Sequence, residues 1–72
     1  MKWTATICLK SGKYITVDEL VSIKSKGGDI PVTNFKDFHL TQGTSLTFVG
    51  KTASVSLFSN EIEYVEFSAM NQ

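Results

Sequence analysis

The chain has 72 residues, with seven lysines, seven acidic residues, one histidine, one cysteine and no arginine. This length is half or less of the roughly 150 residues that one domain usually takes, so we expect a single domain, 1–72, without an internal disulfide. The zero net charge and the lack of arginine argue against a dedicated nucleic-acid reader, because arginine grips phosphate and guanine through its planar fork.

The N-terminal segment predicts a β-hairpin. In residues 2–9 the odd-numbered side chains from Trp3 to Leu9 are apolar, while the even-numbered ones, including Cys8, fall on the opposite side. This period of two is typical of a strand. A Ser-Gly-Lys turn follows, and residues 14–17 resume with β-branched and aromatic side chains, so the two segments form a hairpin.

Residues 16–26 allow two interpretations. The segment begins with a Thr-x-x-Glu sequence, which is the form of a helix capping box. Its apolar residues from Ile15 to Ile23 also share one face of a strand, which Glu19 interrupts. Because β-branched residues are abundant here, we favour a continued strand with a bend near Asp18 and Glu19 over a short helix.

The middle of the chain predicts a loop tip and two short strands. Gly27 and Gly28 mark the loop tip. Pro31 confines the next segment, residues 29–33, to a sheet edge or a strand beginning, since proline has no N–H for a ladder. Residues 35–41 alternate again and predict a short, partly exposed strand.

A second hairpin is expected between residues 44 and 58. Leu46 and Phe48 point one way within residues 44–49, and residues 53–58 alternate apolar with polar or aromatic side chains. Gly50 and the lysine after it supply the turn between the two strands.

The C-terminal part predicts a corner and a last strand. The Ser-Asn pair at 59–60 makes a tight corner or a single helical turn. Residues 61–67 then form a strand with Ile62 and Tyr64 on one side, and residues 68–72 are expected to be a frayed tail.

These elements together predict an all-β domain with at most one short helical turn. Five or six short strands separated by turn signals are typical of a small barrel or a rolled antiparallel sheet. Closure of such a sheet removes its exposed edges.

Two segments resemble parts of Sm-like proteins. Residues 5–17 (ATICLKSGKYITV) resemble their first hairpin, and residues 55–67 (VSLFSNEIEYVEF) resemble their closing strand, corner and strand. The resemblance implies a small barrel of Src-homology-3 or Sm-like type. No binding residue is carried over, because nothing in residues 21–46 reproduces the Asp and the Met-Asn pair that hold the family's uridine pocket. Phe58-Ser59 stands where the family has its closing Arg-Gly.

A second likeness is to short proteins from prophages of Gram-positive bacteria. It depends on the strand-SGK-strand opening and on the Ile-acid-aromatic pattern of residues 61–65. This likeness implies an accessory or host-interaction role rather than an enzyme.

Candidate reactive groups are few. His39 lies two residues from Asp37, on the same face if the segment is a strand, but no nucleophile or second acid accompanies the pair. Cys8 has no base nearby in the sequence, so a structural thiol is favoured over a nucleophile. One cysteine and one histidine cannot build a zinc site, and Glu61, Glu63 and Glu66 do not form a calcium loop. We expect no catalytic residue, cofactor, metal or small-molecule substrate.

The expected compartment is the cytoplasm. The lone cysteine suits a reducing environment, and no apolar run approaches the roughly 20 residues that cross a bilayer. The N-terminus alternates polar and apolar residues and does not form a signal-peptide core. No membrane association is expected.

Surplus aromatic side chains provide the main functional signal. A domain of this size buries only about 60% of its unfolded surface, and its core cannot hold every ring. We expect an interaction surface that includes Tyr14, Phe35, Phe58 and Phe67. The sequence therefore predicts a non-enzymatic protein-interaction module that binds a protein partner or a second copy of itself. A phage-type accessory role is the expectation for this module. The alternative is a nucleic-acid-binding small barrel of Sm-like kind.

Overall fold

The computed structural model describes residues 2–26, 28–31, 38–40 and 42–70. Over these residues the chain forms short strands and one turn of 3-10 helix, η2 (Ser59–Glu61). The strands are β1 (Lys2–Leu9), β2 (Tyr14–Val17), β3 (Leu20–Ser25), β4 (Gly28–Pro31), β5 (Ser45–Gly50), β6 (Ser54–Phe58) and β7 (Ile62–Met70).

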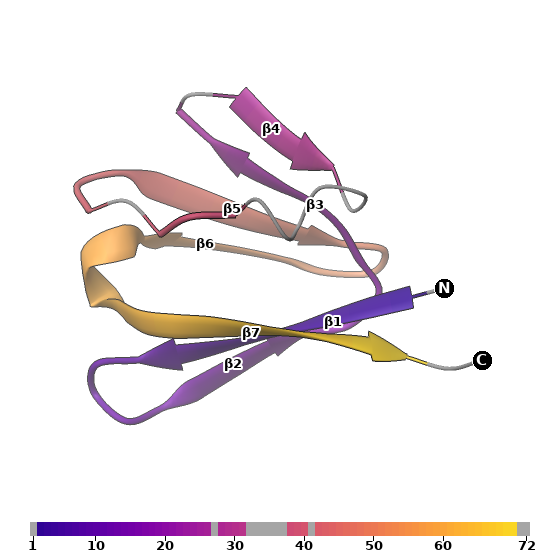
Figure 1. The fold of residues 1–72 in the computed structure, drawn as a ribbon, viewed down its shortest axis with the longest axis horizontal. Helices are drawn as coiled ribbons and strands as arrows, with labels where there is room; N and C mark the ends of the chain where they lie inside the picture. The colour runs from indigo at the N-terminus through magenta and orange to yellow at the C-terminus, as the bar shows by residue number, and fades with distance from the viewer. Residues whose placement is uncertain (1, 27, 32–37, 41, 71–72) are drawn as a thin grey trace.

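The strands form two antiparallel sheets that lie one above the other in Figure 1. The first sheet has the order β2-β1-β7 and the second has the order β4-β3-β5-β6. The all-β prediction with one helical turn is confirmed. Within the described residues there are seven strands rather than five or six, and no ladder joins the two sheets into a closed barrel.

A sharp bend carries the chain from the first sheet to the second. β2 ends at Val17 and β3 begins at Leu20, so only Asp18 and Glu19 separate the two strands. Glu19 has φ 51°, a left-handed conformation that turns the chain abruptly. The predicted strand with a bend at these two residues is confirmed, and the alternative of a short helix is wrong.

Gly50 allows the two sheets to approach closely beside this bend. A Cβ atom on Gly50 would lie 2.9 Å from the carbonyl oxygen of Asp18, 2.9 Å from Cγ1 of Val17 and 2.8 Å from the carbonyl oxygen of Ala53. The backbone N–H of Gly50 donates to that Ala53 oxygen at 2.8 Å. Glycine therefore closes the β5–β6 turn against the bend.

The core lies between the two sheets and is built from inward-facing side chains of both. Phe48, Ile7 and Ile23 are its largest fully buried apolar side chains. The predicted alternation in β1 and β5 accounts for Ile7 and Phe48, because it directs one side chain in two to the interior. The other buried members of the cluster are Ala5, Val17, Leu20, Leu46 and Ile62.

η2 holds the corner between β6 and β7 by hydrogen bonds to the loop before β5. Ser59 is fully buried, its backbone N–H donates to the Thr44 carbonyl oxygen at 2.8 Å, and its Oγ accepts from the Thr44 N–H at 3.1 Å. Oδ1 of Asn60 accepts from the Gly43 N–H at 2.7 Å. The predicted corner or helical turn at 59–60 is confirmed as a helical turn.

The segment before this loop differs from the prediction. Residues 38–40 are not in a strand, whereas residues 32–37 and 41 lie outside the described residues, so the predicted strand 35–41 is wrong where it can be described. Pro31 does lie on an edge strand, β4, as predicted.

The C-terminal strand is longer than predicted. Residues 68–70 belong to β7, where Ser68 pairs with Thr4 and Met70 pairs with Lys2. The expected frayed tail is therefore wrong for these three residues, because they have a complete antiparallel partner in β1.

Candidate protein-interaction face

Two tyrosines flank Cys8 on the solvent side of the first sheet. In the antiparallel register Cys8 is the partner of Tyr14 on β2 and also of Tyr64 on β7. Directly opposed residues on neighbouring strands place their side chains on the same face, about 5 Å apart at Cβ. The row Tyr14–Cys8–Tyr64 therefore crosses all three strands, and we call it the tyrosine row.

A β-bulge brings Tyr64 into this row. Ile62 pairs with Leu9 and Tyr64 pairs with Cys8, so Glu63 has no partner on β1. The extra residue shifts the alternation by one position, because two residues of β7 oppose one step of β1. Ile62 is consequently buried in the core while Tyr64 is exposed, and the prediction that both lie on one side is wrong.

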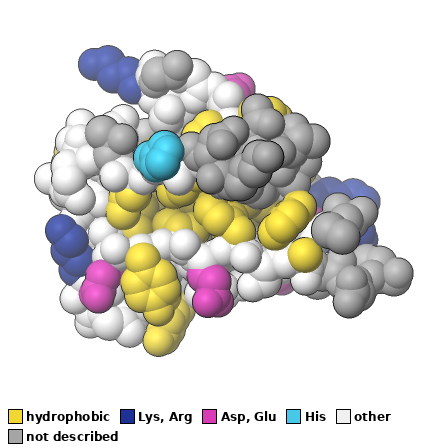
Figure 2. Space-filling view, viewed as in Figure 1, with side chains coloured by type: hydrophobic (Ala, Val, Ile, Leu, Met, Phe, Trp, Pro, Cys, Tyr) yellow, Lys and Arg dark blue, Asp and Glu magenta, His cyan; other side chains and the backbone are white. Residues whose placement is uncertain are grey.

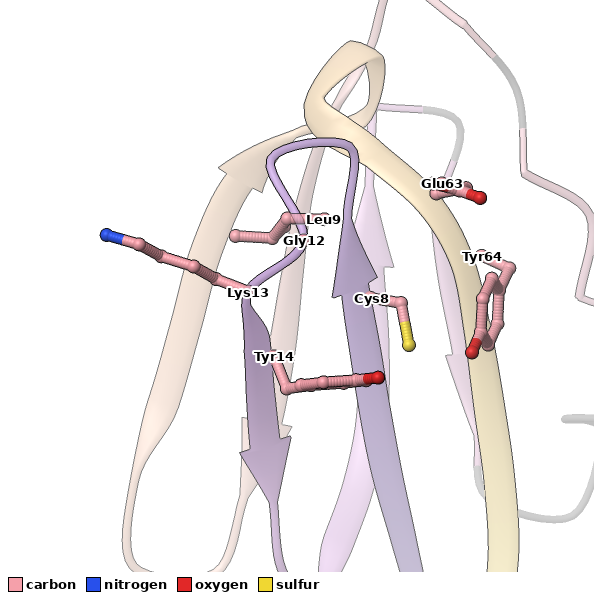
Figure 3. Close-up of a pocket in the computed structure, with 7 residues that line it drawn as sticks. All are labelled: Cys8, Leu9, Gly12, Lys13, Tyr14, Glu63 and Tyr64. Carbon is pink, nitrogen blue, oxygen red and sulfur yellow. The ribbon is translucent and has the colours of Figure 1, made fainter.

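The tyrosines shield the thiol that they flank. Tyr14 is 69% exposed and Tyr64 is 51% exposed, whereas Cys8 between them is only 6% exposed. Figure 3 shows both hydroxyl groups on the same side of the sheet as the Cys8 sulfur, with Tyr14 reaching toward it across β1. A ring on each side thus removes the thiol from solvent, although the thiol lies on the outer face of the sheet.

A shallow pocket of about 210 Å³ opens over the tyrosine row. Its walls include Cys8, Tyr14, Tyr64, Lys13 and Glu63. The Lys13 side chain extends away from the Cys8 sulfur in Figure 3, so its ammonium group does not occupy the space between the rings. The side chains that border the pocket therefore carry phenol, thiol, carboxylate and ammonium groups.

The neighbours of Tyr64 change the pKa of its hydroxyl group. A hydrogen bond to Cys8 and the Coulombic effect of Cys8 raise the pKa of Tyr64 from 10.0 to about 12, and desolvation, Tyr14 and Glu66 add to this shift. Each of these neighbours disfavours a second negative charge on the Tyr64 oxygen. The groups around this hydroxyl therefore favour its protonated form.

The next row of the same face is polar. Thr6 on β1 is the partner of Thr16 on β2 and of Glu66 on β7. Glu66 is exposed, and among the described residues it has no ion-pair partner. The solvent face of the first sheet thus combines two aromatic rings with an uncompensated carboxylate.

The opposite end of the face is occupied by internal contacts. Lys2 forms an ion pair with Glu19, and Oγ1 of Thr4 donates to Oδ1 of Asp18 at 3.5 Å. These contacts tie β1 to the bend between the sheets. They leave the end with the tyrosine row as the part of the face whose side chains are open to a partner.

The four aromatic residues of the predicted interaction surface are not together in the structure. Tyr14 is exposed on the first sheet, and Phe58 is 42% exposed at the end of β6 in the second sheet. Phe67 is half-buried and packs against the core, with its ring 5.6 Å from that of Phe38. Phe35 lies outside the described residues.

Sequence analysis missed two exposed apolar side chains, Tyr64 and Val21, which are each 51% exposed. Strict alternation assigned Tyr64 to the same side of the strand as Ile62. No residue among positions 62–64 signals the bulge that places the two side chains on opposite faces. The acidic residue at position 63 was the only available sign, since a bulged residue has no cross-strand partner and faces solvent.

The structure describes two of the predicted reactive side chains, His39 and Cys8. His39 is exposed in the segment 38–40, while Asp37 lies outside the described residues, so the structure does not test their proximity. Cys8 is a buried free cysteine. In the described part of the chain no three His, Cys, Asp or Glu side chains are grouped as metal ligands would be.

Comparison with known proteins gives no match to a family model, to a curated protein or to a solved structure. Within the residues that the structure describes, no helix has the length and apolar character needed to cross a membrane.

Proposed function

We propose that this chain is a non-enzymatic protein-interaction module that binds its partner through the tyrosine row of the first sheet. The observation that carries the proposal is the exposure of Tyr14 and Tyr64, on either side of Cys8, on a face that no other described element covers. Tyrosine is enriched among the few side chains that supply most of the energy of protein interfaces. Its rigid ring also loses little conformational entropy on binding.

The arrangement of the rings supports a protein partner. Exposed apolar side chains scattered singly are ordinary, but neighbouring ones mark an interaction site. Figure 2 shows exposed hydrophobic side chains over the lower sheet, with acidic side chains on both sides of them. An apolar centre with a charged rim is the usual anatomy of a protein interface.

The finer fold type belongs to the same proposal: a small open barrel of Src-homology-3 type. The bend at 18–19 lets one extended segment serve both sheets, η2 precedes the last strand, and that strand pairs with the first. These features support the fold type, whereas the function is argued from the site alone.

The proposal is tested by site-specific photocrosslinking in cells that express the protein. A photoreactive phenylalanine analogue is placed at Tyr14 or Tyr64 and, as the matched control, at Ser56, which is exposed on β6 of the second sheet. We expect one discrete adduct from positions 14 and 64 and none from position 56. The adduct from position 14 disappears when Tyr64→Ser is also present.

Three outcomes would count against the proposal. Equal adducts from positions 14, 64 and 56 indicate non-specific contact. The absence of any adduct, together with a monomeric mass by light scattering, removes the partner. Adducts to RNA or DNA in place of protein favour the nucleic-acid alternative, since exposed rings also stack on bases.

A further inference from the structure

From the tyrosine row and the carboxylate beside it we infer the chemistry of the partner: the pocket over Cys8 receives a lysine or arginine side chain from an extended segment of the partner protein. This inference depends on the proposed function, because it names the group that the same face recognises.

The first argument is charge complementarity. Glu66 lies one row from Tyr64 on the same face of the sheet, and Glu63 borders the pocket. Among the described residues the ion pair of the first sheet joins Lys2 to Glu19, which leaves both β7 carboxylates uncompensated. Lys13 borders the pocket but extends away from it. Because the ammonium group of Lys13 points away from the Cys8 sulfur in Figure 3, the uncompensated charge nearest the rings on this face is that of Glu66.

The second argument is the chemistry of the rings. The faces of tyrosine rings carry negative electrostatic potential, so a guanidinium or ammonium group within about 6 Å of the ring centre is attracted. Tyr14 and Tyr64 both border the pocket, so a cationic side chain that enters it lies beside two aromatic rings.

The third argument is the shape of the site. An open pocket of about 210 Å³ on the surface of a flat sheet accepts one long side chain more readily than a folded ligand. The stem of lysine or arginine can lie along the rings while its charged head reaches the carboxylates. An extended partner segment places such a side chain at alternate positions on one face.

The experiment uses a defined probe, the blocked tripeptide Gly-Arg-Gly, and its neutral isostere in which citrulline replaces arginine. Binding is followed by NMR chemical shifts of the whole protein. We expect saturable shifts at Tyr14, Tyr64 and Cys8 with the arginine peptide and none with the citrulline peptide. The shifts weaken as ionic strength rises, because salt screens the exposed carboxylates.

Matched variants locate the site. Tyr64→Leu or Tyr14→Leu should weaken arginine binding roughly two- to fivefold, which is the expected contribution of one exposed cation–π contact. Glu66→Gln should weaken it by up to about fivefold. Phe58→Leu and Asp29→Asn remove an exposed ring and an exposed acid from the second sheet, and they should leave binding unchanged.

The outcomes separate this inference from the proposed function. Equal shifts from the arginine and citrulline peptides, or shifts spread over both sheets, overturn the cation site. If position 14 still crosslinks a protein in that case, the interaction face is retained and only its charge preference is wrong. Conversely, face-specific arginine binding without any protein adduct supports the cation site and contradicts the interaction module.

Discussion

Lys2 and Glu19 form an ion pair that joins the first strand to the bend between the two sheets. The two residues are 17 positions apart in the sequence, and Glu19 is also the residue with the left-handed backbone conformation, φ 51°. The contact therefore fixes the point at which the extended segment leaves the first sheet and enters the second.

This ion pair predicts a specific loss of stability in acid. The hydrogen bond and charge of Lys2 lower the pKa of Glu19 below its ordinary value of 4.5. A carboxyl with a lowered pKa in the folded state contributes stability that is present above its unfolded pKa and is lost as the pH falls through the folded pKa. Urea unfolding should therefore show a difference between the wild type and Glu19→Gln that is constant at neutral pH.

Below pH 4.5 this difference should shrink. The control is the same comparison made in a Lys2→Gln background, in which the ion pair is already absent and the pH-dependent difference should be smaller. A wild-type minus Glu19→Gln difference that does not change with pH would contradict the role of the ion pair.

Gly50→Ala should destabilise the fold. The added methyl group would lie less than 3 Å from two carbonyl oxygens and one Val17 carbon, so the bend or the β5–β6 turn must shift. Such overpacking reduces the free energy of unfolding by about 1–3 kcal/mol. Thr52→Ala, on the exposed side of the same turn, should change it by less than about 0.5 kcal/mol. Equal stabilities of the two variants in chemical denaturation would be inconsistent with the close approach.

Ser59→Ala should also reduce stability. Ser59 is fully buried, and its hydroxyl satisfies the Thr44 N–H at 3.1 Å. Loss of one partner leaves a part-buried donor unsatisfied, which costs about 1–3 kcal/mol. Asn60→Ala removes the neighbouring hydrogen bond to Gly43, which is exposed to water, and should have the smaller effect. Thermal unfolding of the two variants in parallel checks this order, and the reverse order would be evidence against it.

An alkaline titration followed by phenolate absorbance should show a separate step for the ionisation of Tyr64. Its pKa of about 12 depends chiefly on Cys8, so phenolate absorbance in Cys8→Ala should rise at lower pH, nearer 10.0. Tyr64→Phe removes the step. A pKa that is higher in the folded state contributes stability below pH 10.0 that is lost as the pH approaches 12. A titration of Tyr64 that is unaffected by Cys8→Ala would refute the contact between the two side chains.

Alternation in the sequence predicted most of the fold. β1, β5 and β6 each place apolar side chains at every second position, and period two leaves few other structures for such segments. The bend at Asp18 and Glu19 was predictable because Glu19 interrupts an otherwise apolar strand face. The pairing of β1 with β7 was not, since it joins residues from opposite ends of the chain through tertiary packing.

The candidate site was predictable only in part. Tyr14 was expected at the surface because the core is too small for every ring, and it is the most exposed of the large hydrophobic side chains that the structure describes. Tyr64 was missed, since the unpaired Glu63 reverses the alternation that the sequence suggests. Phe67 was placed on the surface by counting rings, yet it packs against Phe38 beside the core.

The pairing of Lys2 with Met70 also affects how the chain folds during synthesis. β1 and β2 are adjacent in sequence and can form their hairpin early, but the other edge of β1 gains its partner only after residue 70 has left the ribosome. Contacts between residues so far apart in sequence slow folding, and an unpaired strand edge invites association with other chains. Until β7 has emerged, the nascent hairpin therefore presents an open edge to its neighbours.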